Sequence, residues 1–181
     1  MITYEDVLKK ASEWSDIQAH LVRLYDFTVQ IPVKIKVVVE LGVREGNSTT
    51  SLLAAVNDSG GHLYSIDIDA CIEARKLYGG DSNWTFIRGD DMQVIKGWNK
   101  HIDHLFIDTS HIFDHTLNEL REWGKWVKHG GIITLHDIYV YDSNGKSEVL
   151  DAIEQYMKEN PEKYDFKVFE GSYGLGLLRR K

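Results

Sequence analysis

Cysteine is almost missing from this sequence, with Cys71 the single one in 181 residues. One cysteine cannot form an intrachain disulfide, and it cannot supply a zinc site built on cysteine pairs. A secretory signal is also missing, because the first ten residues carry Glu5 and Asp6 and no apolar stretch. No apolar run approaches the roughly 20 residues needed to cross a bilayer. We therefore expect a cytoplasmic protein with no membrane partner.

Positive charge is scarce as well. The chain has 21 Lys and Arg against 28 Asp and Glu, which leaves a net charge of -7 at pH 7. Binding to a phosphate backbone needs clustered Lys and Arg, so we expect no nucleic-acid partner. Internal repeats, low-complexity segments and interdomain linkers are not evident. With 43% hydrophobic and 27% charged residues, the sequence is typical of one globular domain spanning residues 1–181.

Short apolar runs alternate with segments of helical periodicity. The first run, Lys36-Val-Val-Val-Glu-Leu41, is typical of a parallel strand that helices cover on both faces. The pattern predicts strands at 36–41, 62–66, 84–87, 102–107 and 131–135, and helices at 4–11, 15–30, 47–57, 69–78, 90–97, 115–127 and 147–158. Strands that alternate with helices indicate crossover units and a parallel sheet.

The end of the chain departs from this alternation. Two further strands are predicted at 164–169 and 173–178, with Gly171-Ser172 at a tight turn between them. The predicted fold is therefore α/β, a Rossmann-like three-layer sandwich with a mostly parallel seven-stranded sheet and an antiparallel C-terminal strand. Residues 1–33 are expected to form a helical extension, either a lid or the face of a homodimer, ahead of a ligand-binding core at 34–181.

The loop after the first strand, Glu40-Leu-Gly-Val-Arg-Glu-Gly46, lies where open α/β sheets bind ligands. Gly42 and Gly46 would let the backbone approach a ligand closely, and Asn47 or Ser48 could cap the next helix. A dinucleotide-binding fingerprint starting at Gly42 would need glycine at 44 and 47, and a phosphate-binding P-loop would need lysine at 47. Neither phosphate motif is present. The remaining alternative is a tight turn without a ligand.

Glu40-x-Gly-x-x-x-Gly46 resembles the first motif of class I S-adenosylmethionine (SAM)-dependent methyltransferases. The resemblance implies that this loop lies along the methionine part of SAM, with Ser48 near its carboxylate. Asp67 ends the second strand and is expected to accept hydrogen bonds from the ribose hydroxyls, as acids do in other nucleoside-binding α/β folds.

The adenine end of the cofactor is also covered by the resemblance. It implies that Ile68 packs on the adenine ring, that Asp90 lies near the adenine amino group, and that the Met92 backbone meets the ring edge. The alternative for Asp67 and Asp90 is that each merely caps the helix that follows it.

A second group of polar residues follows the fourth and fifth strands: Asp108, His111, His136 and Asp137. Carboxylates and imidazole can hold a divalent metal or take a proton. Oxygen ligands suit Mg²⁺, and adding histidine shifts the preference towards Mn²⁺, Fe²⁺ or Zn²⁺. The alternative is that these are ordinary residues at strand ends.

This second group resembles that of small O-methyltransferases related to macrolide-sugar and catechol-type enzymes. Those relatives hold Mg²⁺ between an acid after the fourth strand and an acidic or amide pair after the fifth. Here the pair is His136-Asp137. The resemblance implies a metal at Asp108, His136 and Asp137, with Asp108, His111 and His136 as catalytic residues and His111 as the base.

The predicted function is SAM-dependent methyl transfer to a hydroxyl of a small molecule, assisted by a divalent metal. Two alternatives remain open from the sequence. One is a cephalosporin-hydroxylase-like enzyme with iron at the Asp108, His136 and Asp137 cluster. The other is a non-enzymatic module that binds SAM or a nucleoside. The methyl acceptor is not readable from the sequence.

Overall fold

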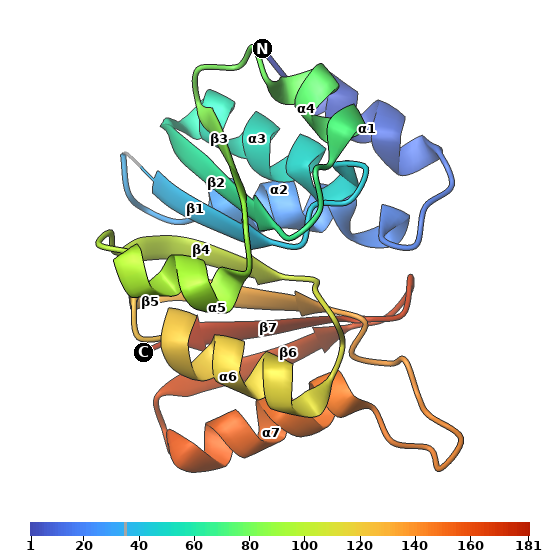
Figure 1. Ribbon diagram of the computed structural model, residues 1–181, viewed down its shortest axis with the longest axis vertical. Coiled ribbons are helices and arrows are strands. Elements are labelled where there is room, and N and C mark those ends of the chain that lie inside the picture. Colours follow the sequence, from blue (N-terminus) through green and yellow to red (C-terminus); the bar gives the residue numbers. More distant parts are fainter. Residues whose placement is uncertain (35) are drawn as a thin grey trace.

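The computed structural model describes residues 1–34 and 36–181. Among these residues, seven strands form one sheet in the order β3-β2-β1-β4-β5-β7-β6 (Figure 1). The strands are β1 (Lys36–Leu41), β2 (Gly61–Asp67), β3 (Trp84–Arg88), β4 (Ile102–Ile107), β5 (Val127–His136), β6 (Tyr164–Phe169) and β7 (Leu175–Arg180). Strands β1 to β5 are parallel, while β7 pairs antiparallel with both β5 and β6. The predicted mostly parallel sheet with an antiparallel C-terminal strand is confirmed.

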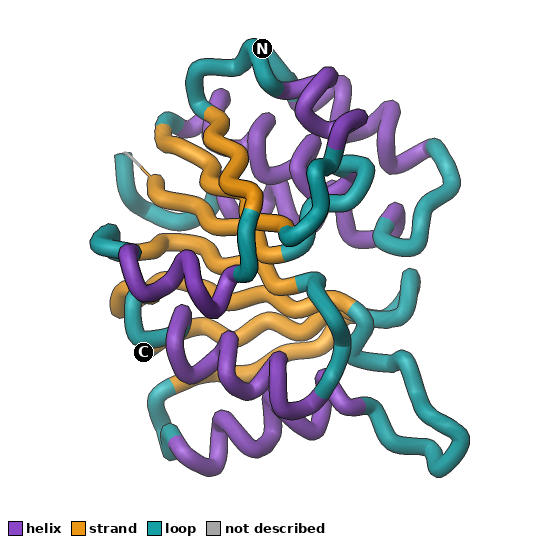
Figure 2. The backbone as a smooth tube through the Cα atoms, in the orientation of Figure 1, coloured by secondary structure: helices purple, strands orange, loops and turns teal. Residues whose placement is uncertain are grey.

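Helices cover both faces of this sheet, which confirms the predicted three-layer arrangement (Figures 1 and 2). Helices α1 to α4 lie on one face, and α5 to α7 on the other. Their bounds, with two short 3-10 helices η1 and η2, are α1 (Tyr4–Ser12), η1 (Gln18–His20), α2 (Leu21–Val29), α3 (Asn47–Ser59), α4 (Ile72–Tyr78), α5 (Asp91–Val94), η2 (Ile95–Gly97), α6 (Phe113–Trp123) and α7 (Glu148–Glu159).

Alternate residues of the central strands enter the two halves of the core. Val38 of β1 and Phe106 of β4 join the cluster beneath α2 and α3, whereas Val39 and Leu105 join the cluster beneath α6 and α7. Successive strand side chains point to opposite faces, so a strand buried on both faces is mostly apolar, and the buried Glu40 and His104 are held by hydrogen bonds. This is why the runs 36–41 and 102–107 identified these strands.

The N-terminal segment is part of one helical layer. Val7 of α1 and Leu21 and Leu24 of α2 are fully buried, in a cluster with Leu52 and Leu53 of α3. Its role as a lid or as a dimer face stays a prediction. Within the described parts of the chain, no helix is both long enough and apolar enough to span a bilayer.

The helix predicted over 15–30 is wrong in its first turn. The segment becomes helical only at Gln18, as η1, and α2 follows from Leu21. Side chains take the place of helical hydrogen bonds here, because the Ser15 amide donates to Gln18 Oε1 and the Ala19 amide to Ser172 Oγ. The helix predicted from 69 likewise begins only at 72, since the Asp67 carboxylate accepts the Asp69 amide.

Three boundaries in the second half also differ from the predictions. Helix α6 spans Phe113–Trp123 instead of 115–127, and β5 begins at Val127 instead of 131, because Val127 already pairs with Ile102 of β4. Strand β7 begins at Leu175 instead of 173. Tyr173 has a positive φ of 60°, a left-handed conformation that no β-strand can contain.

Candidate active site

The loop from β1 to α3 packs tightly against the end of β4. Gly42 has φ of 88°, and a Cβ there would lie 1.9 Å from the Asp108 carbonyl oxygen. Gly46, with φ of 86°, is the N-cap of α3. The expectation that Asn47 or Ser48 caps this helix is therefore wrong, because a left-handed residue starts it and the Ser48 hydroxyl donates to Glu40 instead.

Glu40 and Ser48 lie beneath this loop and hold it. The fully buried Glu40 carboxylate accepts hydrogen bonds from the hydroxyls of Ser48 at 2.6 Å, Thr49 at 2.9 Å and Ser65 at 2.5 Å. Burial raises the pKa of Glu40 to about 7 despite these donors. Both residues thus shape the loop from below and are not among the residues that line the neighbouring cleft.

That cleft opens at the carboxyl ends of β1 to β4 and has a volume of about 680 Å³. Of the predicted cofactor-binding residues, it is lined by Gly42, Asp67, Ile68, Asp90 and Met92. Ile68 is 69% exposed. An apolar side chain that stands free at the wall of a cleft is suited to a flat aromatic ligand group.

Asp67 and Asp90 both accept backbone hydrogen bonds at the floor of the cleft. Asp67 Oδ2 accepts from the amides of Val43 at 2.8 Å and Arg44 at 3.1 Å, and Oδ1 accepts from Asp69. Burial acts to raise the pKa of Asp67, but these amide donors lower it below its ordinary value. Asp90 accepts the Met92 amide at 2.8 Å and caps α5. Asp90 therefore caps the helix that follows it, whereas Asp67 does not, because α4 begins at Ile72 with Cys71 as its N-cap. Both acids line the cleft.

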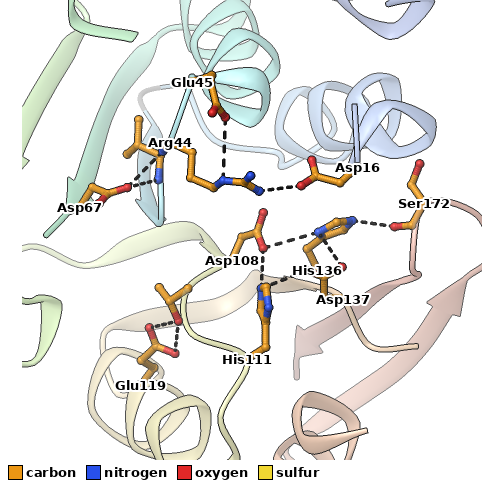
Figure 3. A network of polar contacts seen from close by, with 12 residues as sticks. Asp16, Arg44, Glu45, Asp67, Asp108, His111, Glu119, His136, Asp137 and Ser172 are labelled. Atoms are coloured by element: carbon orange, nitrogen blue, oxygen red, sulfur yellow. Dashed lines mark hydrogen bonds and ion pairs between the residues drawn. The ribbon is translucent and has the colours of Figure 1, made fainter. Parts of the chain in front are cut away.

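The cleft is strongly acidic. Its lining includes one arginine, Arg44, and five aspartates, namely Asp67, Asp69, Asp90, Asp91 and Asp108. The Arg44 guanidinium lies 2.6 Å from Asp16 and 3.8 Å from Glu45 (Figure 3). Adjacency in the sequence accounts only for the Arg44–Glu45 pair. Asp16 precedes η1 and no sequence spacing connects it to the β1–α3 loop.

Beside the cleft, the second predicted group converges into one cluster of two acids and two histidines (Figure 3). His111 Nε2 lies 3.0 Å from Asp108 Oδ1 and 3.0 Å from Asp137 Oδ2. His136 Nδ1 lies 3.5 Å from Asp108 Oδ1 and 3.4 Å from Asp137 Oδ1. The His111 side chain is 35% exposed, whereas that of His136 is 1% exposed. Of the two histidines, only His111 can therefore contact a bound organic substrate.

The two carboxylates of the cluster raise the pKa of both histidines. Hydrogen bonds to Asp108 and Asp137 raise the pKa of His111 to about 9. Burial alone would lower the pKa of His136, but the same two carboxylates raise it to about 10. For both acids, burial opposes ionisation, yet the histidines hold their pKa below the ordinary value. Two buried carboxylates this close need positive charge between them.

The donor set fits a divalent cation. His136 Nδ1 and Asp137 Oδ1 are buried and have no hydrogen-bond partner within the described ranges 1–34 and 36–181. Ligand atoms of Asp108, His111 and Asp137 all lie within 4.8 Å of one another. Carboxylate and imidazole are usual metal ligands. The predicted metal residues Asp108, His136 and Asp137 thus lie together, and His111 lies with them.

Sequence reasoning missed a second cluster along the cleft wall. His115 Nε2 lies 3.4 Å from Asp91 Oδ1 and 3.4 Å from Glu119 Oε1. A hydrogen bond to Glu119 raises the pKa of His115 to about 9. The spacing of four between His115 and Glu119 on one helix was the available signal.

The comparisons with known proteins agree with this geometry. The family described as "Methyltransferase domain" matches residues 39–138, more than half of the chain. Methyltransferase PaMTH1 of Podospora anserina, solved with SAH bound, is 17% identical with a TM-score of 0.72, over 98% of this chain and 87% of that one. An O-methyltransferase from Bacillus cereus in complex with SAH is 15% identical with a TM-score of 0.74, over 98% and 90%.

A third similar structure comes from a different class of methyltransferase. An rRNA methylase from Streptococcus thermophilus is 14% identical with a TM-score of 0.67, over 92% of this chain and 97% of that one. At such identities, the likeness shows the shared fold, which is the Rossmann-like fold of SAM-dependent methyltransferases. The match over 39–138 goes further, and the chain belongs to this methyltransferase family.

Proposed function

We propose that this enzyme transfers the methyl group of SAM to a hydroxyl of a small molecule. The observation that carries the proposal is the charge of the cleft, where five aspartates outnumber the two basic side chains Arg44 and His115. SAM has a cationic sulfonium and no phosphate, so an acidic wall attracts it. The same wall repels the pyrophosphate of a dinucleotide. Asp67 would accept the ribose hydroxyls, Ile68 would pack on the adenine, and Asp90 with the Met92 backbone would meet the adenine edge.

The acceptor would bind beside Asp108, next to the sulfonium end of the cofactor. Attack by a hydroxyl oxygen on the methyl carbon breaks the carbon–sulfur bond and leaves neutral SAH and one proton. His111 Nε2, which lies 3.0 Å from both Asp108 Oδ1 and Asp137 Oδ2, is the group proposed to receive this proton. It can do so when positive charge other than its own proton balances Asp108 and Asp137.

A divalent metal is proposed to supply that charge, held by Asp108, His136 and Asp137. When bound, such an ion lowers the pKa of the acceptor hydroxyl and orients it. The carboxylates bind the ion, and His111 remains the proton acceptor at the exposed side. His136 is too deeply buried to touch the acceptor itself.

The acidic opening also supports a small acceptor over a nucleic acid. A phosphate backbone would have to approach the five aspartates of the cleft, where Arg44 and His115 are the only basic side chains among the described residues of the lining. We therefore propose that the chain does not act on RNA, although one similar structure is an rRNA methylase. A filter-binding assay with RNA is expected to show no retention at 150 mM salt. Tight binding with a steep salt dependence would contradict the proposal.

Titration calorimetry tests the cofactor half of the proposal. SAH is expected to bind, and NAD is expected to give no measurable heat, because its pyrophosphate meets the acidic wall. Tighter binding of NAD than of SAH would overturn the proposed function.

A double variant, Asp108→Asn with Asp137→Asn, tests the second half. Methyl transfer to a catechol or sugar probe substrate is expected to fall by about 100-fold or more, because the variant removes the carboxylates that would hold the ion and that position His111, and a mispositioned base alone costs about this much. SAH affinity should stay close to that of the unmodified protein, because the ribose and adenine contacts are elsewhere. Asp165→Asn on the exposed edge strand β6 is the matched control. Activity that survives EDTA but disappears in His111→Ala would exclude the metal and leave general base catalysis.

A further inference from the structure

The tautomer of His136 is fixed by the backbone. Nε2 lies 2.7 Å from the carbonyl oxygen of Ser172. A carbonyl oxygen can only accept a hydrogen bond, so Nε2 carries the proton. When a cation between the two carboxylates takes the place of the second ring proton, Nδ1 offers a lone pair. This buried nitrogen, which has no hydrogen-bond partner among residues 1–34 and 36–181, faces Asp108 and Asp137.

The turn that supplies this carbonyl is held in place from the N-terminal segment. Gly171–Gly174 joins β6 to β7, and each of its four residues has a positive φ, between 39° and 95°. His20 Nε2 donates to the Gly171 carbonyl at 2.7 Å, and the Ala19 amide donates to Ser172 Oγ at 3.1 Å. Helix η1 and the turn together point the Ser172 carbonyl at His136. A backbone turn with this much constraint is typical of functional sites.

We propose that the divalent ion of this enzyme is a transition ion that accepts nitrogen, one of Mn²⁺, Fe²⁺, Co²⁺ or Zn²⁺, with His136 Nδ1 as a ligand beside Asp108 and Asp137. The inference rests on the proposed function for the place of the site. Mg²⁺ takes oxygen ligands and keeps several waters, whereas imidazole suits transition ions. A histidine that binds a metal almost always donates its other ring N–H to a carboxylate, carbonyl or water. The contact of His136 with Ser172 is of this kind.

The distances around Nδ1 support a shared ion. Nδ1 lies 3.5 Å from Asp108 Oδ1 and 3.4 Å from Asp137 Oδ1. These separations are long for a nitrogen–oxygen hydrogen bond. Two ligand atoms bound tetrahedrally to one zinc-sized ion lie roughly 3.3–3.5 Å apart, given bond lengths near 2.0–2.2 Å. Nδ1 is therefore spaced from each of the two oxygens as one ligand of an ion is spaced from another.

Pulsed electron paramagnetic resonance on the full chain tests the inference directly. The protein is treated with a chelator and loaded with Mn²⁺ alone. Nitrogen-14 modulation from a bound imidazole is expected, and it should disappear in His136→Asn, where an amide oxygen can take the position of Nδ1. The modulation should survive in His101→Asn, the matched control, because His101 lies at the amino end of β4, away from the cluster at its carboxyl end. Loss in His136→Asn also assigns the nitrogen to His136 instead of His111.

Calorimetry with single metals gives a second measurement. His136→Asn is expected to weaken Zn²⁺ or Co²⁺ binding by about 10-fold or more, the scale seen when metal-site geometry is disturbed. Mg²⁺ affinity should change little or increase. Bound Mn²⁺ without nitrogen modulation in the unmodified protein overturns the inference, whatever the variants do. Failure of SAH to bind would sink the proposed function, whereas SAH binding without any metal binding would sink only this inference.

Discussion

Asp67 illustrates how one residue serves both fold and ligand. Its two oxygens accept amides from Val43, Arg44 and Asp69, which fixes the β1–α3 loop to the end of β2. The Cys71 thiol lies beside the same carboxylate, so a ribose hydroxyl would share its oxygens with these donors. Fixing the loop and binding a ligand are therefore roles of the same two oxygens.

Asp67→Ala is expected to weaken SAH binding by about 1.5–3 kcal/mol, the range for a hydrogen bond to a charged group. The loss combines the ribose contact with a looser loop. Calorimetric titration of SAH measures it, with Asp165→Ala as the control at an exposed acid. An Asp67→Ala protein that binds SAH as tightly as the unmodified one would refute the ribose role.

At the scale of elements, the β1–α3 loop depends on close contact with β4. Gly42 provides that contact, because its Cα faces the Asp108 carbonyl where no side chain fits. Asp108 belongs to the cluster beside the cleft, so the same contact links the cofactor loop to the proposed metal site.

Gly42→Ala is expected to lower the free energy of unfolding by about 1–3 kcal/mol, as overpacking does, and to weaken SAH binding. The added Cβ must push the loop away from β4, and φ of 88° disfavours alanine in any case. Urea denaturation measures the first effect. Gly97→Ala is the matched control, since a Cβ there meets nothing within 4 Å in the part of the chain that the structure describes. Equal stability of both variants would show that the contact is not needed.

For the molecule as a whole, a buried histidine joins α2 to the sheet. The Thr28 hydroxyl donates to the Leu24 carbonyl at 2.8 Å, so it accepts from His104 Nδ1 at 2.7 Å. His104 Nε2 then accepts from Thr134 at 2.7 Å. The neutral ring is fully satisfied, and burial lowers the pKa of His104 to about 3.

This linkage predicts a loss of stability in mild acid. In the unfolded chain, His104 takes up a proton near its ordinary pKa of 6.5, while in the folded chain it stays neutral down to about pH 3. The stabilisation is complete above pH 6.5 and is lost as the pH falls towards 3, by about 1.5 kcal/mol between pH 6.5 and 5. His104→Gln, which cannot titrate, is expected to show a flatter pH dependence in urea denaturation. An unchanged slope would contradict the assignment, and His101→Gln should keep it.

The order of strands and helices was determined by the sequence, because burial on both faces of a parallel sheet demands apolar runs that are visible residue by residue. The motif Glu40–Gly46 and the acids at strand ends were visible because they come at the ends of these apolar runs. The helix starts near 18 and 72 were not visible, since side chains take the amide donors there: Gln18 and the distant Ser172 before α2, and Asp67 before α4.

Only the tertiary structure decided how the site is held together. His111 and Asp137 adopt left-handed conformations, with φ of 55° and 59°, which place their side chains against each other. Local propensity does not predict that backbone conformation for either residue. The contacts of Arg44 with Asp16 and of His136 with Ser172 join segments 28 and 36 residues apart. Such contacts form because folding brings the strand ends to one edge, and no local pattern in the chain records them.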